Sequence, residues 1–156
     1  MIRKADARDA DSIAAIWNHV IRDTAQTFTT AQKDPSALAA QIGQQPCFVA
    51  ETGGRVVGFV IYGPFRAGPG YAFTMEHSIH VAQDARGAGL GRALMTAAED
   101  HARAADIHSM IAGVAGENDA GAAFHAALGY RQIARLPQVG WKFGRWHDLV
   151  LMQKLL

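Results

Sequence analysis

The chain has 156 residues, 49% of them hydrophobic and 19% charged, which is typical of one globular domain and excludes a disordered chain or two independent domains. Its 15 basic and 14 acidic residues nearly cancel and leave no broad field that would attract nucleic acid or an anionic membrane. The single cysteine cannot form an internal disulfide, and no signal peptide or long apolar run is present, so we expect a single cytoplasmic domain over residues 1–156 that binds neither nucleic acid nor membrane.

The N-terminal half predicts two helices followed by a β-hairpin. Apolar residues recur at helical spacing after a run of capping aspartates, and Asp34-Pro35 is a typical helix start. The pair Gly53-Gly54 lies between two runs of β-forming residues and predicts a tight antiparallel turn. We expect, in order, a strand at 2–4, a helix with apolar positions from 13 to 21, a helix from 34 to Pro46, and strands at 47–52 and 55–62.

In the C-terminal half, strands alternate with helices. Asn118 can cap one helix, and Gly129 suits the left-handed position that ends it. A segment rich in Gly and Trp is expected to join the last two strands as a connection. The expected elements are a loop at 63–70, a strand at 73–81, a helix from about Leu90, a strand at 109–115, a helix at 118–128, and strands at 130–136 and 148–155.

A glycine-rich segment connects the strand ending at Val81 to the next helix. Helix N-termini present unpaired backbone N–H groups, and glycines let an anion approach the main chain closely. The segment therefore predicts a diphosphate site. A Rossmann motif would need its third glycine at position 92, where Arg stands, and a P-loop would need a Gly-Lys-Ser/Thr run, so neither motif matches. The residues expected to surround the diphosphate are Arg86, Gly87, Ala88, Gly89, Leu90, Gly91 and Arg92.

The spacing Arg86-x-x-Gly89-x-Gly91 resembles the coenzyme A pyrophosphate motif of the GNAT acetyltransferase superfamily. More closely, segments 75–81, 125–130 and 142–148 resemble the phosphinothricin/methionine sulfoximine acetyltransferase family, and the resemblance spans nearly the whole chain. It implies an α/β fold with a central, mostly antiparallel sheet flanked by helices. The sheet would splay near the end of the strand at 73–81 and admit acetyl-coenzyme A (acetyl-CoA). The resemblance also implies a homodimer.

The same resemblance assigns roles in acetyl transfer to an amine. The main chain of Ile79, His80 and Val81, together with Asn118, would hold the pantetheine arm and the thioester. An amine must lose a proton before it attacks, and Glu76 is the base implied by the family. The leaving thiolate needs a proton, which His125 could supply. His125 stands where many GNAT enzymes have tyrosine, so a role in positioning the substrate stays open beside the acid role.

The expected substrate is a small-molecule amine, an L-amino acid analogue such as phosphinothricin, methionine sulfoximine or methionine sulfone. Arg66 lies in a Gly/Pro loop ten residues before Glu76 and could grip the α-carboxylate. Phe28 and Tyr71 could supply an aromatic wall and a hydroxyl donor, and Trp146 is a further expected neighbour of the substrate.

Two alternative functions and two exclusions complete the interpretation. The enzyme could instead acetylate protein N-termini or polyamines, or the chain could be a non-catalytic acyl-CoA-binding protein. His77 and His80 have an odd offset along a strand and should face opposite sides, so we expect no metal site. Cys47 is expected in the core and not as a nucleophile. The physiological amine is not determined by the sequence.

Overall fold

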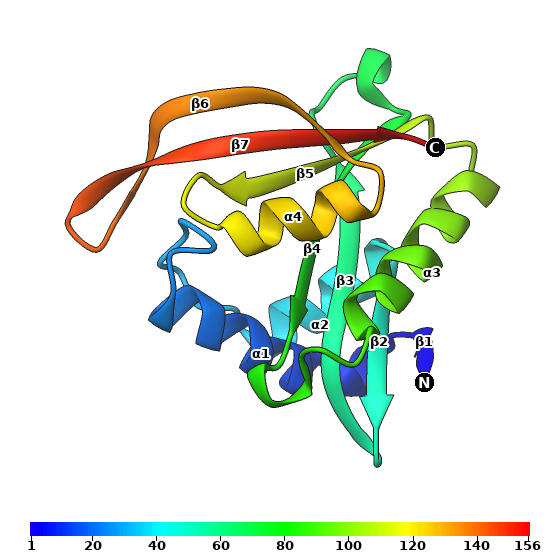
Figure 1. Cartoon of the computed structure of the whole chain (residues 1–156). Coiled ribbons are helices and arrows are strands. Elements are labelled where there is room, and N and C mark those ends of the chain that lie inside the picture. Colours follow the sequence, from blue (N-terminus) through cyan, green and yellow to red (C-terminus); the bar gives the residue numbers. More distant parts are fainter.

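A computed structural model describes every residue from Met1 to Leu156. Its centre is an open seven-stranded sheet in the order β1-β2-β3-β4-β5-β7-β6, in which β4 and β5 are the one parallel pair (Figure 1). This confirms the mostly antiparallel α/β fold expected from the resemblance. The strands are β1 (Ile2–Lys4), β2 (Cys47–Thr52), β3 (Arg55–Pro64), β4 (Thr74–Val81), β5 (Ser109–Ala115), β6 (Arg131–Lys142) and β7 (Arg145–Leu155). The helices are α1 (Ala10–Asp23), α2 (Pro35–Gln44), α3 (Leu90–Ala104) and α4 (Asp119–Ala127).

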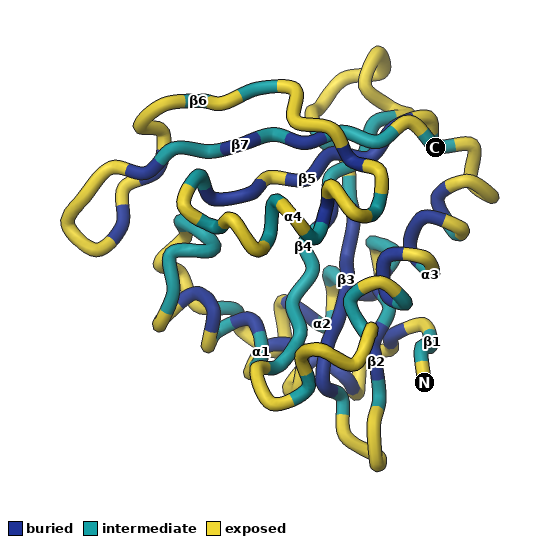
Figure 2. The backbone as a smooth tube through the Cα atoms, viewed as in Figure 1, coloured by how far each residue is buried: buried dark blue, intermediate teal, exposed yellow.

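Apolar side chains form one core cluster on each face of the sheet. On one face, α1 and α2 pack against β2 and β3, where Phe59 and Ile61 are buried. On the other face, α3 covers Val60 and Tyr62 of the same strand. Successive strand residues alternate between faces, which is why β3 is buried along most of its length (Figure 2). No helix in this fold has the length and apolar character needed to cross a membrane.

The expected elements are present, with one clear error near the C-terminus. The Gly53-Gly54 turn has both φ angles positive, at 57° and 75°, as a tight hairpin requires. The segment expected to connect the last two strands is itself strand, because β6 and β7 continue to a turn at Phe143 and Gly144. Two register irregularities in β6 interrupt the strict alternation of buried and exposed side chains, which hides the strand from a periodicity argument.

The sheet opens between β4 and β5. Their parallel ladder runs from Thr74 paired with Ser109 to His77 paired with Ala112 and stops there. Beyond it, β4 stays paired with β3 as far as Val81, and β5 stays paired with β7 as far as Ala115. The expected splay is therefore present, and it begins just after His77.

Candidate active site

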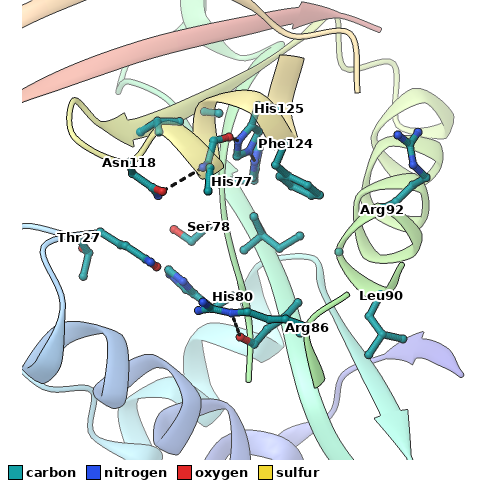
Figure 3. Close-up of a pocket in the computed structure, with 18 of the residues that line it drawn as sticks. Thr27, His77, Ser78, His80, Arg86, Leu90, Arg92, Asn118, Phe124 and His125 are labelled. Carbon is teal, nitrogen blue, oxygen red and sulfur yellow. Dashed lines mark hydrogen bonds between the residues drawn. The ribbon is translucent and has the colours of Figure 1, made fainter. Parts of the chain in front are cut away.

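A cavity of about 690 Å³ lies at the opening between β4 and β5. This volume is within the range of small-molecule sites. Residues from both faces of the sheet line it: Trp17 and the loop after α1 on one side, α4 and the start of α3 on the other. In Figure 3, Ser78 and His80 extend from β4 on the side of Thr27, whereas His77 lies beside His125 and Phe124. A ligand in this cavity can therefore be reached from both faces.

The edge of β4 inside the gap offers backbone groups to a ligand. From Ser78 to Val81, β3 is the only strand paired with β4. In an antiparallel pair, alternate residues direct both N–H and C=O away from the partner strand, so the gap side holds unpaired groups. Nε of Arg86 donates to the Val81 carbonyl at 3.3 Å and ties the glycine-rich turn to the end of this strand. An extended ligand arm could take the place of the missing strand.

The glycine-rich turn has the backbone geometry that the predicted anion site requires. Gly87 and Gly89 have φ angles of 84° and 76°, and Gly89 caps α3 without a side-chain hydrogen bond. The first helical N–H to find an acceptor is that of Ala93, so the three N–H groups before it point outward. Six of the seven expected residues line the cavity, and the exception is Ala88. Gly91 is required for a different reason, because a Cβ at this position would lie only 3.1 Å from the Phe124 ring.

Glu76 lies on the face of β4 that also carries Ser78 and His80. Its carboxylate makes no hydrogen bond or ion pair, and burial raises the pKa of this group. A Cβ built on Gly113 would stand 3.3 Å from Oε2 of Glu76, and Gly113 lines the cavity. The missing side chain at Gly113 therefore leaves room for the carboxylate beside the cavity. A carboxylate with a raised pKa is a stronger base, which suits removal of a proton from an ammonium.

His125 lies on the opposite face of the sheet and is joined to His77. Nδ1 of His125 is 2.8 Å from the Gly121 carbonyl, and its Nε2 is 2.9 Å from Nε2 of His77. Burial lowers the pKa of both rings, that of His77 to about 3. A carbonyl only accepts, so neutral His125 carries its proton on Nδ1 and accepts at Nε2 from His77. In this arrangement His77 Nδ1 has no partner.

A buried polar network that the sequence did not indicate supports the two histidines. Tyr130 lies edge-on to both rings, at 5.6 Å from His77 and 5.3 Å from His125. Its hydroxyl donates to Glu99, which also accepts from Nζ of Lys154 at 2.6 Å. The network joins α3 to β7, and no local pattern could have connected these residues.

The residues expected to contact substrate are scattered. Phe28 is half-buried and does not itself line the cavity, although Thr27 and Thr29 on either side of it in the sequence do. Arg66 and Tyr71 lie together in the exposed 65–73 loop, with the guanidinium 5.5 Å from the ring centre, and neither lines the cavity. Trp146 is exposed and packs on Trp141. The cavity of one chain is thus lined by most of the expected coenzyme residues and by His125, while Glu76 lies beside it and none of the four expected substrate residues lines it.

Some cavity residues were missed by the sequence argument. Lys33 and Trp17 line the wall on the α1 side, with Nζ of Lys33 4.3 Å from the Trp17 ring.

His80 packs against Trp17 and Phe59, while His77 packs against His125 and Tyr130, so the two histidines do face opposite sides. Burial raises the pKa of the Cys47 thiol to about 12, as expected of a core cysteine. The structure holds no cluster of three metal-ligating side chains.

Comparison with known proteins identifies the family. The model of the acetyltransferase (GNAT) family matches residues 13–130. The chain belongs to the GNAT acetyltransferase family. It is 39% identical, over 97% of its length and 92% of the relative's, to an L-methionine sulfoximine/L-methionine sulfone acetyltransferase of Salmonella typhimurium. This GNAT protein is an acetyl-CoA-dependent N-acetyltransferase.

Two solved structures show how closely the fold is shared. A phosphinothricin acetyltransferase from Sinorhizobium meliloti, solved in complex with acetyl-CoA, has a TM-score of 0.94 at 30% identity and covers 100% of this chain and 88% of its own. A ribosomal-protein-alanine N-acetyltransferase from Brucella melitensis has a TM-score of 0.96 at 37% identity, covering 100% and 99%. The resemblance to the phosphinothricin/methionine sulfoximine acetyltransferases is confirmed, and acetyl-CoA is the co-substrate.

Proposed function

We propose that this GNAT enzyme transfers the acetyl group of acetyl-CoA directly to the α-amine of a small L-amino acid analogue, of the phosphinothricin, methionine sulfoximine or methionine sulfone type. The observation that carries the proposal is the cavity at the break in the sheet. It has the glycine-rich turn on one face, and on the other the unpaired carboxylate of Glu76 lies behind Gly113 of its wall. The 39% identity with the Salmonella enzyme supports the substrate class.

In the proposed reaction both substrates are bound at once. Bound acetyl-CoA supplies an acetyl thioester. The turn at 86–92 holds the diphosphate through backbone N–H groups, and Asn118 with the β4 edge at Ile79, His80 and Val81 holds the pantetheine arm. Glu76 accepts the proton of the ammonium, and N–H groups of the β4 edge stabilise the developing oxyanion.

Two roles for His125 place different demands on its hydrogen bonds. As proton donor to the thiolate it must carry a proton on Nε2 as well as on Nδ1, and that Nε2–H must point to the thiolate instead of to His77. As a positioning residue it needs only the neutral pair, in which no N–H is left for the thiolate. The lowered pKa of both rings supports the positioning role. His125→Phe separates the roles: a donor lowers kcat, whereas a positioning residue affects mainly the KM of the amine.

We propose Phe28 as a wall of the amine site, and Arg66 as the carboxylate clamp with Tyr71 and Trp146 nearby. Phe28 is not a lining residue, but its sequence neighbours Thr27 and Thr29 are, which supports placing it behind that wall. Arg66 has no carboxylate partner within the chain, which leaves its guanidinium available to an anion. Lys33 is a cation that does line the cavity, so it is the natural comparison in any test of Arg66.

Acetylation of protein N-termini is the second candidate, because the Brucella structure carries that name at 37% identity. The deciding experiment is a thiol-release screen with purified enzyme across amino acid analogues, short peptides and polyamines. Turnover of phosphinothricin or methionine sulfone well above that of every peptide supports the first proposal. Turnover of peptides alone, or of polyamines alone, contradicts it.

We also propose a homodimer that acts in the cytoplasm, where acetyl-CoA is available. The edge strand β6 supports the dimer, because an exposed edge bearing apolar side chains favours pairing. Three large apolar residues of β6 are each more than 45% exposed: Ile133, Val139 and Trp141. Sedimentation equilibrium of the wild type and of Trp141→Lys tests the dimer, and a wild-type monomer would contradict it.

A further inference from the structure

The loop after α1 is held by a buried lysine. Only 2% of Lys142 is exposed, and its Nζ donates to the carbonyl oxygens of Thr24 at 2.6 Å and Thr27 at 2.8 Å. It forms no ion pair, and desolvation lowers its pKa. Burying an ammonium costs free energy unless its donors are satisfied. Here the backbone of one loop satisfies two of them, so the lysine fixes that loop to β6.

A second contact, made by the side chain of Phe28, attaches the same loop to the β6–β7 hairpin. The Phe28 ring stacks on His147 of β7, with ring centres 5.3 Å apart. It also occupies the space above Gly140, where a Cβ would overlap the ring. His147 is itself fixed, because its Nε2 donates to the Lys142 carbonyl at 2.9 Å. Gly140, Lys142 and His147 thus form one notch at the tip of the β6–β7 hairpin, and Phe28 fills it.

The far end of the loop is tied to α1. The Asn18 side chain accepts from the Lys33 N–H at 2.6 Å and donates to the Lys33 carbonyl at 3.1 Å. Between these attachments, Gln26, Thr27 and Thr29 line the cavity, together with Lys33 at the end. All of these lie on the face of the sheet that holds Glu76 and Ser78. The glycine-rich turn for the coenzyme starts from the opposite side of the gap.

The hairpin also reaches the coenzyme side. Nδ1 of His147 is 3.1 Å from Oε1 of Glu117, and Arg145 donates to both oxygens of that carboxylate. Glu117 precedes Asn118, the residue that caps α4 and lines the cavity. The same hairpin tip therefore contacts both the 24–33 loop and the chain that enters α4.

We propose that Lys142 is a positioning residue that holds the 24–33 loop as a fixed wall of the amine site, so that the β6–β7 hairpin determines which amines fit. The proposal rests on the proposed function only in taking this end of the cavity as the amine end. Lys142 does not touch the reacting atoms. Its effect on catalysis is transmitted through the backbone at Thr24 and Thr27.

The test is Lys142→Met, which keeps most of the buried chain and removes the donors. We expect faster hydrogen–deuterium exchange of amides in residues 24–33, and a KM for the amine raised by roughly tenfold or more, as expected when a positioning contact is lost. The KM for acetyl-CoA should change less than about twofold. Lys4→Met, which removes an exposed charge on β1, is the matched control and should leave all three unchanged.

Each outcome decides part of the proposal. Unchanged hydrogen–deuterium exchange of amides 24–33 in a folded Lys142→Met enzyme would show that Lys142 does not hold the loop. Faster exchange with an unchanged amine KM overturns the assignment of the loop as the amine wall. If Lys142→Met does not fold, Phe28→Ala removes the second contact between the same loop and the hairpin, and unchanged exchange of amides 24–33 in that variant would show that the hairpin does not hold the loop. The exchange measurement needs no substrate. It therefore tests the hold of Lys142 on the loop separately, even if the screen shows that the proposed amino acid analogues are not acetylated.

Discussion

Nε2 of His77 lies 2.9 Å from Nε2 of His125, and both rings are buried. Because Nδ1 of His125 faces a carbonyl, a neutral pair can hold its protons in one arrangement only. We expect nitrogen NMR at pH 7 to show His125 as the Nδ1–H tautomer and His77 as the Nε2–H tautomer. The lowered pKa of both rings keeps them neutral at this pH. A protonated or Nε2–H His125 would instead support the donor role.

Glu76→Gln is expected to lower kcat by roughly a hundredfold or more, since general bases commonly contribute that much. The loss should shrink at high pH, where the amine is already neutral. In the wild type, the acid limb of the pH–rate profile should lie above the ordinary carboxyl range, because burial raises the pKa of Glu76. A variant that keeps the wild-type profile would remove Glu76 from the mechanism.

The same substitution has an expected sign for stability. A carboxyl group whose pKa is raised by folding disfavours the folded state once it ionises, that is, as pH rises through its unfolded pKa. The cost is absent at low pH and present at pH 8. Glu76→Gln should therefore raise or preserve Tm at pH 8, measured by thermal unfolding, while activity falls. A clearly lower Tm at pH 8 would show that the carboxylate has a stabilising partner.

Gly89→Val is expected to weaken acetyl-CoA binding by at least roughly tenfold, because a branched side chain disfavours φ of 76° at the start of the anion site. Gly54→Val is a matched control: its φ is 75°, and it lies in the β2–β3 turn outside the cavity. Isothermal titration calorimetry on both separates backbone strain from coenzyme binding. Equal affinities would contradict the assignment of the turn.

Arg66→Ala is expected to lower kcat/KM for amino acid analogues by roughly tenfold or more, because a carboxylate loses its bidentate partner. Amines without a carboxylate should be unaffected. Lys33→Met should be measured beside it, since Lys33 lines the cavity and Arg66 does not. A loss with Lys33→Met alone would move the carboxylate site from the 65–73 loop to the α1 side of the cavity.

Local patterns were sufficient for the parts of the site that are contiguous in sequence. The turn from Arg86 to Arg92 contains its glycines, its helix start and its charges in seven successive residues, so the pattern and the site coincide. Lys142 and Thr24 are far apart in sequence and meet only because a long hairpin bends over the loop after α1. No periodicity encodes that contact. The same holds for the pair of His77 and His125, which needs β4 and α4 to be placed first.

The short ladder between β4 and β5 is the one connection within the sheet between its two halves. Strands β1 to β4 and strands β5 to β7 are joined within the sheet by the four residue pairs from Thr74–Ser109 to His77–Ala112. A coenzyme arm laid along the open edge would bridge the two halves just where backbone pairing ends. Acetyl-CoA should then be a structural link as well as a reactant. The two halves of the sheet should be more tightly coupled when the acetyl donor is bound.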